Sequence, residues 1–363
     1  MSYENIPSER PEALRIAVIG TGWIGAFHAR SLADHIPGAQ LYAVADPAEG
    51  RAAALAAEVG CPRATQRIED VFEDEQVDAV VIGAPSAFHA QLITQAARAG
   101  KHVFCEKPTA HAVKDLDAAL EEVERAQVVF QVGFNRRFSA DFAYAGEQVR
   151  AGAIGRVQLL RSVTRDPAVA GGLPNAGAIR SHVIFTETLI HDFDALNWLN
   201  PGAQAVEVHT VAAALVAPEH KDSGLLDTAV VTVRYDNGAI AIAEASFSAS
   251  YGYDVRGEVF GSGGMLQAGG PAHQSAILFD AQGAQAETSR LNIDLFADAY
   301  RKQLDVFVLK VRGTRQGTAH AALEVPGGSD ARAALRIALA ALESHESGLP
   351  VRLDAASRLA VAG

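Results

Sequence analysis

Over the first third of the chain, short apolar segments alternate with segments of helical character. The apolar segments lie at 15–19, 41–45, 77–82, 102–105 and 128–134. Their continuous apolar character is typical of strands that are buried on both faces of a parallel sheet. Helical patterns lie between them, at 26–33, 49–59, 91–99 and 114–126. This order predicts a doubly wound α/β domain of about six strands that ends near residue 134.

Beyond residue 134 the pattern changes to strands that follow one another directly. Segments with partial alternation lie at 155–165, 205–216, 228–235, 239–248 and 255–260, with a turn signal at 236–238. Helical patterns interrupt them at 187–199 and 331–344. We predict an α/β domain over 1–134 and an α+β domain over 135–363 with a large, mainly antiparallel sheet. The helix at about 331–344 is a candidate to pack back on the first domain, and we expect the loop-like segment 168–180 to line or cover a site.

The first apolar segment runs into Gly20-Thr21-Gly22-Trp23-Ile24-Gly25, which opens a helix. The spacing G-x-G-x-x-G between a strand and a helix is the fingerprint of a Rossmann dinucleotide-binding domain. Gly20 permits a tight turn, Gly22 lets the backbone approach a pyrophosphate, and Gly25 lets helix and strand pack closely. The helix N-terminus then offers N–H groups and partial positive charge to the phosphates.

Asp46 ends the second apolar segment, about 20 residues after the last glycine of the loop. Its carboxylate favours NAD over NADP, because it accepts hydrogen bonds from a ribose diol and repels a 2′-phosphate. NADP remains the less favoured alternative because of Arg51, since a guanidinium just beyond the acid can pair with the 2′-phosphate.

Composition narrows the class of protein. The chain has 363 residues, 49% of them hydrophobic and 20% charged, as in soluble globular proteins of two domains. The formal net charge of −12 argues against a nucleic-acid partner. No apolar run approaches the ~18 residues that span a membrane, and the first ten residues lack a signal-peptide core. Cys61 and Cys105 form no zinc or disulfide pattern, so we expect a cytoplasmic protein.

Three further stretches carry candidate chemistry. Glu106-Lys107-Pro108 follows a strand, where ligands of open α/β sheets bind, so Lys107 is a candidate cation of the cofactor site. The alternative is an ordinary solvated lysine. At the domain join, Phe134-Asn135-Arg136-Arg137-Phe138 places two cations between aromatic residues. These arginines either form an interdomain salt bridge or bind substrate hydroxyls.

In the third stretch, Glu187, His191 and Asp194 share one face of the predicted helix because they are spaced i, i+4 and i+7. A carboxylate beside an imidazole suits acid–base catalysis. Two alternatives stay open: a solvated helix face, or a divalent-metal site of an isomerase or lyase.

The motifs GTGWIG, VADP, FCEKP, GFNRRF, RDP, ETLIHDFDALNWL and YGYDVRGEVFG occur in this order over nearly the whole chain. Together they resemble the Gfo/Idh/MocA oxidoreductases, most closely the inositol dehydrogenase branch. The resemblance implies a Rossmann domain followed by a large antiparallel sheet whose open face often packs against another subunit, and so a homo-oligomer, either a tetramer or a dimer.

The resemblance also assigns roles to residues. It implies Lys107, His191 and Glu187 as catalytic residues, with Glu187 standing where the inositol enzymes usually have Asp. Asn135 stands where methionine is common, which suggests altered substrate recognition. The expected cofactor-binding residues are Gly20, Gly22, Trp23, Ile24, Gly25, Asp46, Ser86, His89, Glu106 and Lys107. The expected substrate-binding residues are Asn135, Arg136, Asp194, Tyr251 and Tyr253, and no metal is expected.

These residues predict NAD-dependent oxidation of a ring secondary alcohol of myo- or scyllo-inositol to the keto-inositol. His191 would take the hydroxyl proton while Lys107 stabilises the alkoxide. The nearest alternative is an aldose or pyranose dehydrogenase of the same family. Alternatives from other classes are a non-catalytic NAD-bound sensor and a metal-dependent isomerase.

Overall fold

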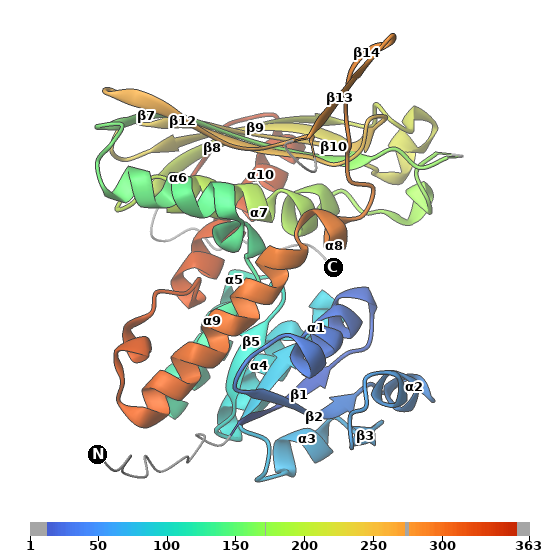
Figure 1. Ribbon diagram of the computed structural model, residues 1–363. Helices are drawn as coiled ribbons and strands as arrows, with labels where there is room; N and C mark the ends of the chain where they lie inside the picture. The colour runs from blue at the N-terminus through green and yellow to red at the C-terminus, as the bar shows by residue number, and fades with distance from the viewer. Residues whose placement is uncertain (1–12, 171, 273–275, 354–363) are drawn as a thin grey trace. The chain divides into compact units, whose positions relative to one another are not determined.

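The computed structural model describes residues 13–170, 172–272 and 276–353, which form two compact units (Figure 1). Unit 1 comprises residues 13–105, 121–131 and 301–325, and unit 2 comprises 106–120, 132–300 and 326–353. The division is therefore not at a single boundary near residue 134, because the chain crosses between the units several times. Among the described residues, no helix is long and apolar enough to cross a membrane.

Unit 1 is built on a six-stranded sheet with the order β3-β2-β1-β4-β5-β6. The strands are β1 (Leu14–Ile19), β2 (Ala39–Ala45), β3 (Ala64–Thr65), β4 (Ala79–Ile82), β5 (His102–Cys105) and β6 (Phe130–Val132). Neighbouring strands from β3 to β5 pair in parallel, and this order is that of a doubly wound dinucleotide-binding fold. The helices of unit 1 are α1 (Trp23–Asp34), α2 (Arg51–Glu58), α3 (Glu69–Glu73), η1 (Ser86–Phe88) and α4 (His89–Arg98). The helix α5 (Val113–Ala126) is divided between the units, with residues 113–120 in unit 2 and 121–126 in unit 1.

A late helix, α9 (Ala297–Gln316), also belongs to the core of unit 1, followed by η6 (Ala319–Ala322). Leu304, Phe307, Val308 and Val311 pack into the same buried cluster as the strands of the sheet. Their spacing of i, i+3, i+4 and i+7 is that of an amphipathic helix, a signal that the sequence analysis did not use.

Unit 2 contains a seven-stranded sheet with the order β12-β11-β7-β10-β9-β8-β15. The strands are β7 (Val157–Pro167), β8 (Ala205–Ala213), β9 (Thr228–Tyr235), β10 (Ile240–Ala249), β11 (Asp254–Gly261), β12 (Gly264–Gly270) and β15 (Val351–Arg352). Among these described strands only β7 and β10 pair in parallel, so the expected fold class is confirmed. The predicted turn joins β9 to β10, with Gly238 at φ +86°.

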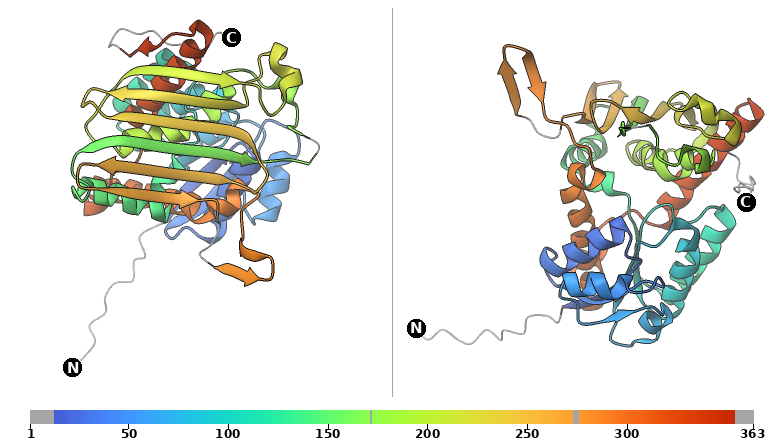
Figure 2. Two further views of the ribbon diagram at one scale, coloured as in Figure 1. Left: turned by 90° about the horizontal axis from the view of Figure 1, so that it is seen from above. Right: turned by 90° about the vertical axis from the view of Figure 1, so that its right-hand side faces the viewer.

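Three helices cover one face of this sheet: α6 (Ala140–Arg150), α7 (Ile190–Trp198) and α10 (Gly328–Ser347) (Figure 1). The opposite face is not covered by any described element (Figure 2). The remaining elements are η2 (Asn135–Phe138), η3 (Ala176–Ala178), the π-helical turn η4 (Ile184–Thr188), η5 (Pro218–Ser223), the hairpin β13 (Ile277–Asp280) and β14 (Gly283–Ala286), and α8 (Asn292–Leu295). The helix expected at 331–344 lies within α10, which packs on β8 and α7 of unit 2. It also contacts α5 of the predicted first domain, where Arg332 Nε donates to Asp117 at 2.7 Å.

Candidate active site

A cavity of about 550 Å³ lies at the carboxyl ends of β1, β2 and β4. Its walls include Gly20 after β1, Asp46 after β2 and Gly83 after β4, which is where doubly wound folds bind ligands. Trp23 and Ile24 from the start of α1 also line it. The sequence motif and the cavity therefore coincide.

The three glycines of the loop differ in what they permit. Gly20 has φ +92°, and a Cβ there would lie 2.6 Å from the Ala84 nitrogen. A Cβ at Gly25 would lie 1.9 Å from the Gly20 carbonyl oxygen, so this glycine allows α1 to pack on the loop. At Gly22 a Cβ would meet no described atom within 4 Å. The space at Gly22 is open to a ligand, as the approach of a pyrophosphate requires.

Asp46 accepts hydrogen bonds from the Thr21 nitrogen (2.8 Å), the Thr21 hydroxyl (2.6 Å) and the Ala48 nitrogen (2.9 Å). Burial raises the pKa of this carboxyl, but these hydrogen bonds and the charge of Arg51 outweigh it, so the pKa lies below its ordinary value. Arg51 also lines the cavity and donates to the Thr21 carbonyl oxygen (3.1 Å). A stable carboxylate with a neighbouring guanidinium is thus in place.

The other expected cofactor residues of unit 1 are not in the cavity wall. His89 is buried and a ring nitrogen lies 2.8 Å from the Ala84 oxygen, so it supports the loop after β4. Ser86 lies in η1 beside Phe88, an exposed aromatic residue that does line the cavity. Phe88 is not among the cofactor residues predicted from the sequence, although an apolar residue shortly after Pro85 at a strand end was a usable signal.

Unit 2 holds a second cluster of chemistry-bearing side chains. Lys107 Nζ donates to the Glu187 main-chain oxygen at 2.9 Å and lies 3.7 Å from Glu187 Oε2. Glu187 belongs to the π-helical turn η4 that precedes α7. Single π-helical turns of this kind are frequent at functional sites. Two predicted catalytic residues, 80 positions apart, are therefore in contact.

His191 is the second residue of α7, and its ring lies edge-on to Phe134 at 6.4 Å between centroids. Burial and the charges of Lys107 and Arg136 lower its pKa well below the ordinary value of 6.5. The imidazole is therefore neutral at neutral pH and able to accept a proton. Nδ1 has no hydrogen-bond partner in the part of the chain that the structure describes.

Asp166 of β7 is the acid of this cluster that the expected site residues omitted. Burial raises its pKa to about 6, against the opposing charge of Lys107. Tyr253 lies close enough for the charge of Asp166, together with burial, to raise the tyrosine pKa. A single acid in a strand gives no spacing pattern, so only the RDP motif pointed to it.

Several predicted substrate-binding residues instead bond to other protein groups. Asp194 is 1% exposed and both its oxygens accept from Arg137. The Tyr251 hydroxyl donates to Asp254 at 2.7 Å and accepts from Arg165 at 3.4 Å. Arg136 forms an ion pair with Asp192, and Arg137 forms one with Asp194. All four residues belong to unit 2, so neither ion pair is an interdomain salt bridge.

Asn135 is 2% exposed and Glu106 is 5% exposed, so both side chains are buried. Asn135 directly precedes Arg136, and Glu106 directly precedes Lys107. A Cβ at Gly133 would meet the Glu106 carboxyl group at 2.8 Å, which shows how closely this acid packs. Within the described residues, no three His, Cys, Asp or Glu side chains come together as a metal-binding group.

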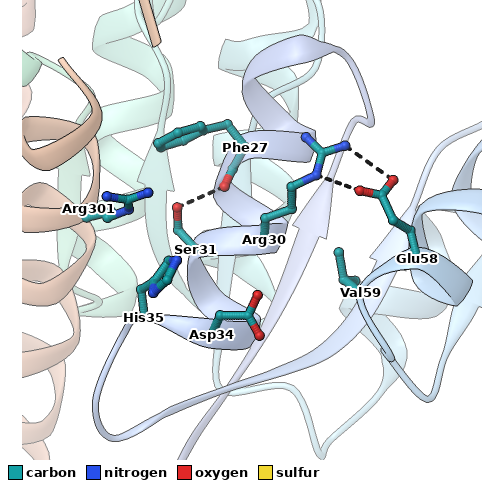
Figure 3. Close-up of a pocket in the computed structure, with 8 residues that line it drawn as sticks. All are labelled: Phe27, Arg30, Ser31, Asp34, His35, Glu58, Val59 and Arg301. Atoms are coloured by element: carbon teal, nitrogen blue, oxygen red, sulfur yellow. Dashed lines mark hydrogen bonds and ion pairs between the residues drawn. The ribbon is translucent and has the colours of Figure 1, made fainter. Parts of the chain in front are cut away.

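A third feature is a surface cavity of about 350 Å³ between α1, the end of α2 and α9 (Figure 3). Arg30 donates to Glu58 from Nε (2.6 Å) and from Nη2 (3.2 Å). Arg301 lies 5.9 Å from the centre of the Phe27 ring. These cations already have protein partners, so this cavity does not match the chemistry of a catalytic site.

Comparison with known proteins adds to this geometry. Residues 14–134 match the Gfo/Idh/MocA family model, described as an oxidoreductase family with an NAD-binding Rossmann fold, and residues 142–267 match the Gfo/Idh/MocA C-terminal domain. The chain belongs to the Gfo/Idh/MocA oxidoreductase family. The resemblance seen in the sequence motifs is therefore confirmed. This Gfo/Idh/MocA protein is an oxidoreductase whose cofactor is NAD, and the residues around Gly22 and Asp46 fit that cofactor.

Several named relatives are similar to this chain over almost its whole length. The chain is 36% identical over 343 residues to myo-inositol 2-dehydrogenase of Thermotoga maritima, and the match covers 94% of this chain and 99% of the relative. It is 33% identical over 342 residues to scyllo-inositol 2-dehydrogenase (NAD(+)) of Bacillus subtilis, covering 94% and 96%. A solved structure of scyllo-inositol dehydrogenase from Lactobacillus casei, with bound NAD(H) and scyllo-inositol, superposes with TM-score 0.87 at 28% identity, covering 94% and 99%.

Proposed function

We propose that this protein oxidises a ring secondary alcohol of myo- or scyllo-inositol to the keto-inositol, with NAD as the hydride acceptor. The observation that carries the proposal is the cluster of Lys107, Glu187 and a neutral His191 in an NAD-dependent oxidoreductase. The names of the relatives from Thermotoga maritima and Bacillus subtilis support inositol as the substrate.

In this proposal His191 takes the proton of the reacting hydroxyl, because its imidazole is neutral at neutral pH. Lys107 donates a hydrogen bond to the same oxygen and stabilises the negative charge that develops there. NAD, when bound, accepts the hydride from the ring carbon. Glu187 holds the Lys107 ammonium in place through the contact at 3.7 Å.

For the other hydroxyls of the ring we propose Asp166 and Tyr253 as partners in unit 2. A carboxylate accepts hydrogen bonds and a phenol also donates one, so together they suit a polyol rather than a simple alcohol. Each buried polar atom left unpaired would cost about 1–3 kcal/mol, which disfavours substrates with one hydroxyl. The roles of Arg136, Asp194 and Tyr251 are then indirect, through the partners described above.

The test is NADH formation with a panel of inositol isomers and of aldoses in D and L forms. We expect an inositol to give the highest kcat/KM. His191→Ala should bind NAD as wild type does but lose at least ~10²-fold in kcat, the range for removing a general base. A higher kcat/KM with an aldose would favour a pyranose dehydrogenase, and activity confined to a monohydroxy acid would overturn the proposal.

We also infer that the protein works as a homo-oligomer, a dimer or a tetramer. The uncovered face of the seven-stranded sheet carries an apolar row, aligned across β10, β7, β11 and β12, of Ile240, Leu159, Phe260 and Met265. These side chains are 41–50% exposed, and a contiguous apolar row of this kind marks an interaction site. Both cysteines are free thiols, which supports a cytoplasmic setting.

A further inference from the structure

Arg136 is buried in unit 2 with all its terminal donors in use. It is 3% exposed, and Nη1 donates to Asp192 Oδ1 (2.7 Å) and to the Ser162 hydroxyl (3.2 Å). Nη2 donates to Asp192 Oδ2 (3.3 Å) and to the Thr164 hydroxyl. A guanidinium has four terminal N–H groups, and these four contacts account for them. None of these four terminal N–H groups is left to bind a substrate hydroxyl.

The same two hydroxyls also hold the carboxylate. Ser162 donates to Asp192 Oδ1 at 2.5 Å and Thr164 donates to Asp192 Oδ2 at 2.7 Å. Asp192 is fully buried, so the network is closed and its members come from η2, β7 and α7. A buried ion pair of this kind contributes little net stability, because desolvation opposes the attraction of the charges. A role in positioning charge explains it better.

The network lies directly beside the candidate base. Asp192 follows His191 in α7, and Arg136 follows by two residues Phe134, whose ring contacts the imidazole. A catalytic histidine is usually oriented by a carboxylate on its second nitrogen. Here Nδ1 has no partner among the described residues, and Asp194 is bonded to Arg137. The neighbouring charges that act on the imidazole are instead the cations Lys107 and Arg136.

We propose that Arg136 is a positioning residue: held by Asp192, Ser162 and Thr164, its guanidinium places a fixed positive charge near His191 rather than binding substrate. The proposed role of Arg136 rests on the proposed function in one respect only: the proton that His191 accepts comes from a substrate hydroxyl. The charge disfavours the imidazolium, and burial in the same unit strengthens that effect. The role differs from the substrate-binding role that the sequence motif implied for Arg136.

Other charged groups near His191 enter the same balance. Lys107, from the segment after β5, adds to the effect of Arg136. The acids are Glu187 from η4, Asp192 from α7 and Asp166 from β7, which interacts with Lys107. A test of Arg136 must therefore change its charge while these groups stay in place.

For two variants that change one charge each, the proposal predicts shifts of the pH profile in opposite directions. Arg136→Gln removes the cation, so the pKa of His191 should rise, and the acidic limb of kcat/KM should move to higher pH by roughly half to one unit. Asp192→Asn removes the opposing anion, so the limb should move to lower pH. Thr164→Val and Ser162→Ala remove hydrogen bonds without changing charge, and they should leave the limb where it is in wild type.

The double variant Arg136→Gln, Asp192→Asn removes the ion pair and leaves a neutral pair of similar shape. The acidic limb of the double variant should return toward that of wild type. If Arg136→Gln alone does not fold, the double variant replaces it in the test. Unchanged limbs in both single variants, or shifts in the same direction, would overturn the proposal. A purely structural network predicts loss of stability in all four single variants with no ordered shift of the limb.

A titration of His191 that needs no substrate keeps this test apart from the proposed function. The imidazole ¹³C resonance of histidine-labelled protein reports the pKa directly in wild type and variants. If wild type oxidises no polyol, the proposed function fails while the titration still decides the role of Arg136. If the polyol is oxidised but the pKa of His191 is the same in every variant, the positioning role fails alone.

Discussion

At the scale of single residues, Asp46 combines a low pKa with a place in the cofactor cavity beside Arg51. Asp46→Ala should narrow the difference between NAD and NADP in kcat/KM, because it removes the charge that repels a 2′-phosphate. Adding Arg51→Ala to Asp46→Ala should then reduce NADP use, since the guanidinium would pair with that phosphate. The prediction is checked by steady-state kinetics with both cofactors. Equal or better use of NADP by wild type would contradict it.

Asp166 gives a prediction about stability and pH. Its pKa is raised by burial to about 6 from 3.8, so the folded state binds a proton that the unfolded state has already released between these values. The carboxylate therefore destabilises the fold above about pH 6, and Asp166→Asn should raise the unfolding temperature at pH 8. Near pH 3, where the carboxyl is protonated in both states, the variant should differ little from wild type.

The same variant should also lose activity with polyols, because the amide of an asparagine is a weaker acceptor than the charged carboxylate that it replaces. Thermal unfolding measured across pH 3 to 8 checks the stability part, and kcat/KM at pH 8 checks the second. A destabilised Asp166→Asn at pH 8 would show that the carboxylate is needed by the fold rather than by the substrate.

Single residues also show what the sequence could predict. The places of Gly20, Gly22 and Asp46 in the cofactor cavity could be predicted, because one local strand–turn–helix unit sets their geometry. The place of Asp194 could not be predicted, because helix spacing says which face a residue occupies but not which partner meets it there. Arg137 lies 57 positions earlier in the chain and takes both of its oxygens. Helical spacing carries no information on such a long-range partner.

At the scale of elements, α9 is the helix whose packing the sequence analysis did not foresee. Phe307 is fully buried and its ring lies 6.0 Å from that of Phe104 in β5. Phe307→Ala should lower the free energy of unfolding by about 3–5 kcal/mol, the usual cost of emptying a core aromatic site. The measurement is chemical denaturation followed by circular dichroism.

Lys302→Ala on the same helix is the matched control, because the Lys302 side chain is 56% exposed. It should change the free energy of unfolding by no more than ~0.5 kcal/mol. Equal effects of the two substitutions would mean that the packing of α9 contributes nothing to the stability of unit 1.

The predicted helix over 187–199 shows a second limit at this scale. The structure divides it into the π-helical turn η4 and the regular helix α7. Apolar spacing detects a helix but cannot distinguish its hydrogen-bond type, since a π-helical turn changes the register locally. In this turn the Glu187 main-chain oxygen accepts a hydrogen bond from Lys107, the contact on which the proposed catalytic cluster depends.

At the scale of the whole molecule, the uncovered face of the seven-stranded sheet predicts self-association. Phe260→Glu places a charge in the apolar row, so it should weaken the oligomer, because burying an unpaired carboxylate is costly. Tyr144→Glu is the control: Tyr144 is 60% exposed on α6, which packs on the other face. Sedimentation equilibrium should show a smaller mass for the first variant only, and a monomeric wild type would contradict the prediction.

Alternation of strands and helices in the sequence was enough to predict both sheets. It was not enough to predict that 301–325 returns to unit 1 or that 106–120 belongs to unit 2. Such returns depend on long-range packing, such as that of Val308 and Val311 against the strands of unit 1, which no local pattern encodes.

The most direct test of the central claim follows the hydrogen itself. Scyllo-inositol deuterated at its ring carbons would be incubated with wild-type protein and NAD, and the cofactor then analysed by mass spectrometry. The account predicts deuterated NADH in amounts equal to the keto-inositol formed, and Lys107→Met should slow both together. Conversion of the inositol with no deuterium in the cofactor, or deuterium released to water alone, would contradict oxidation by hydride transfer.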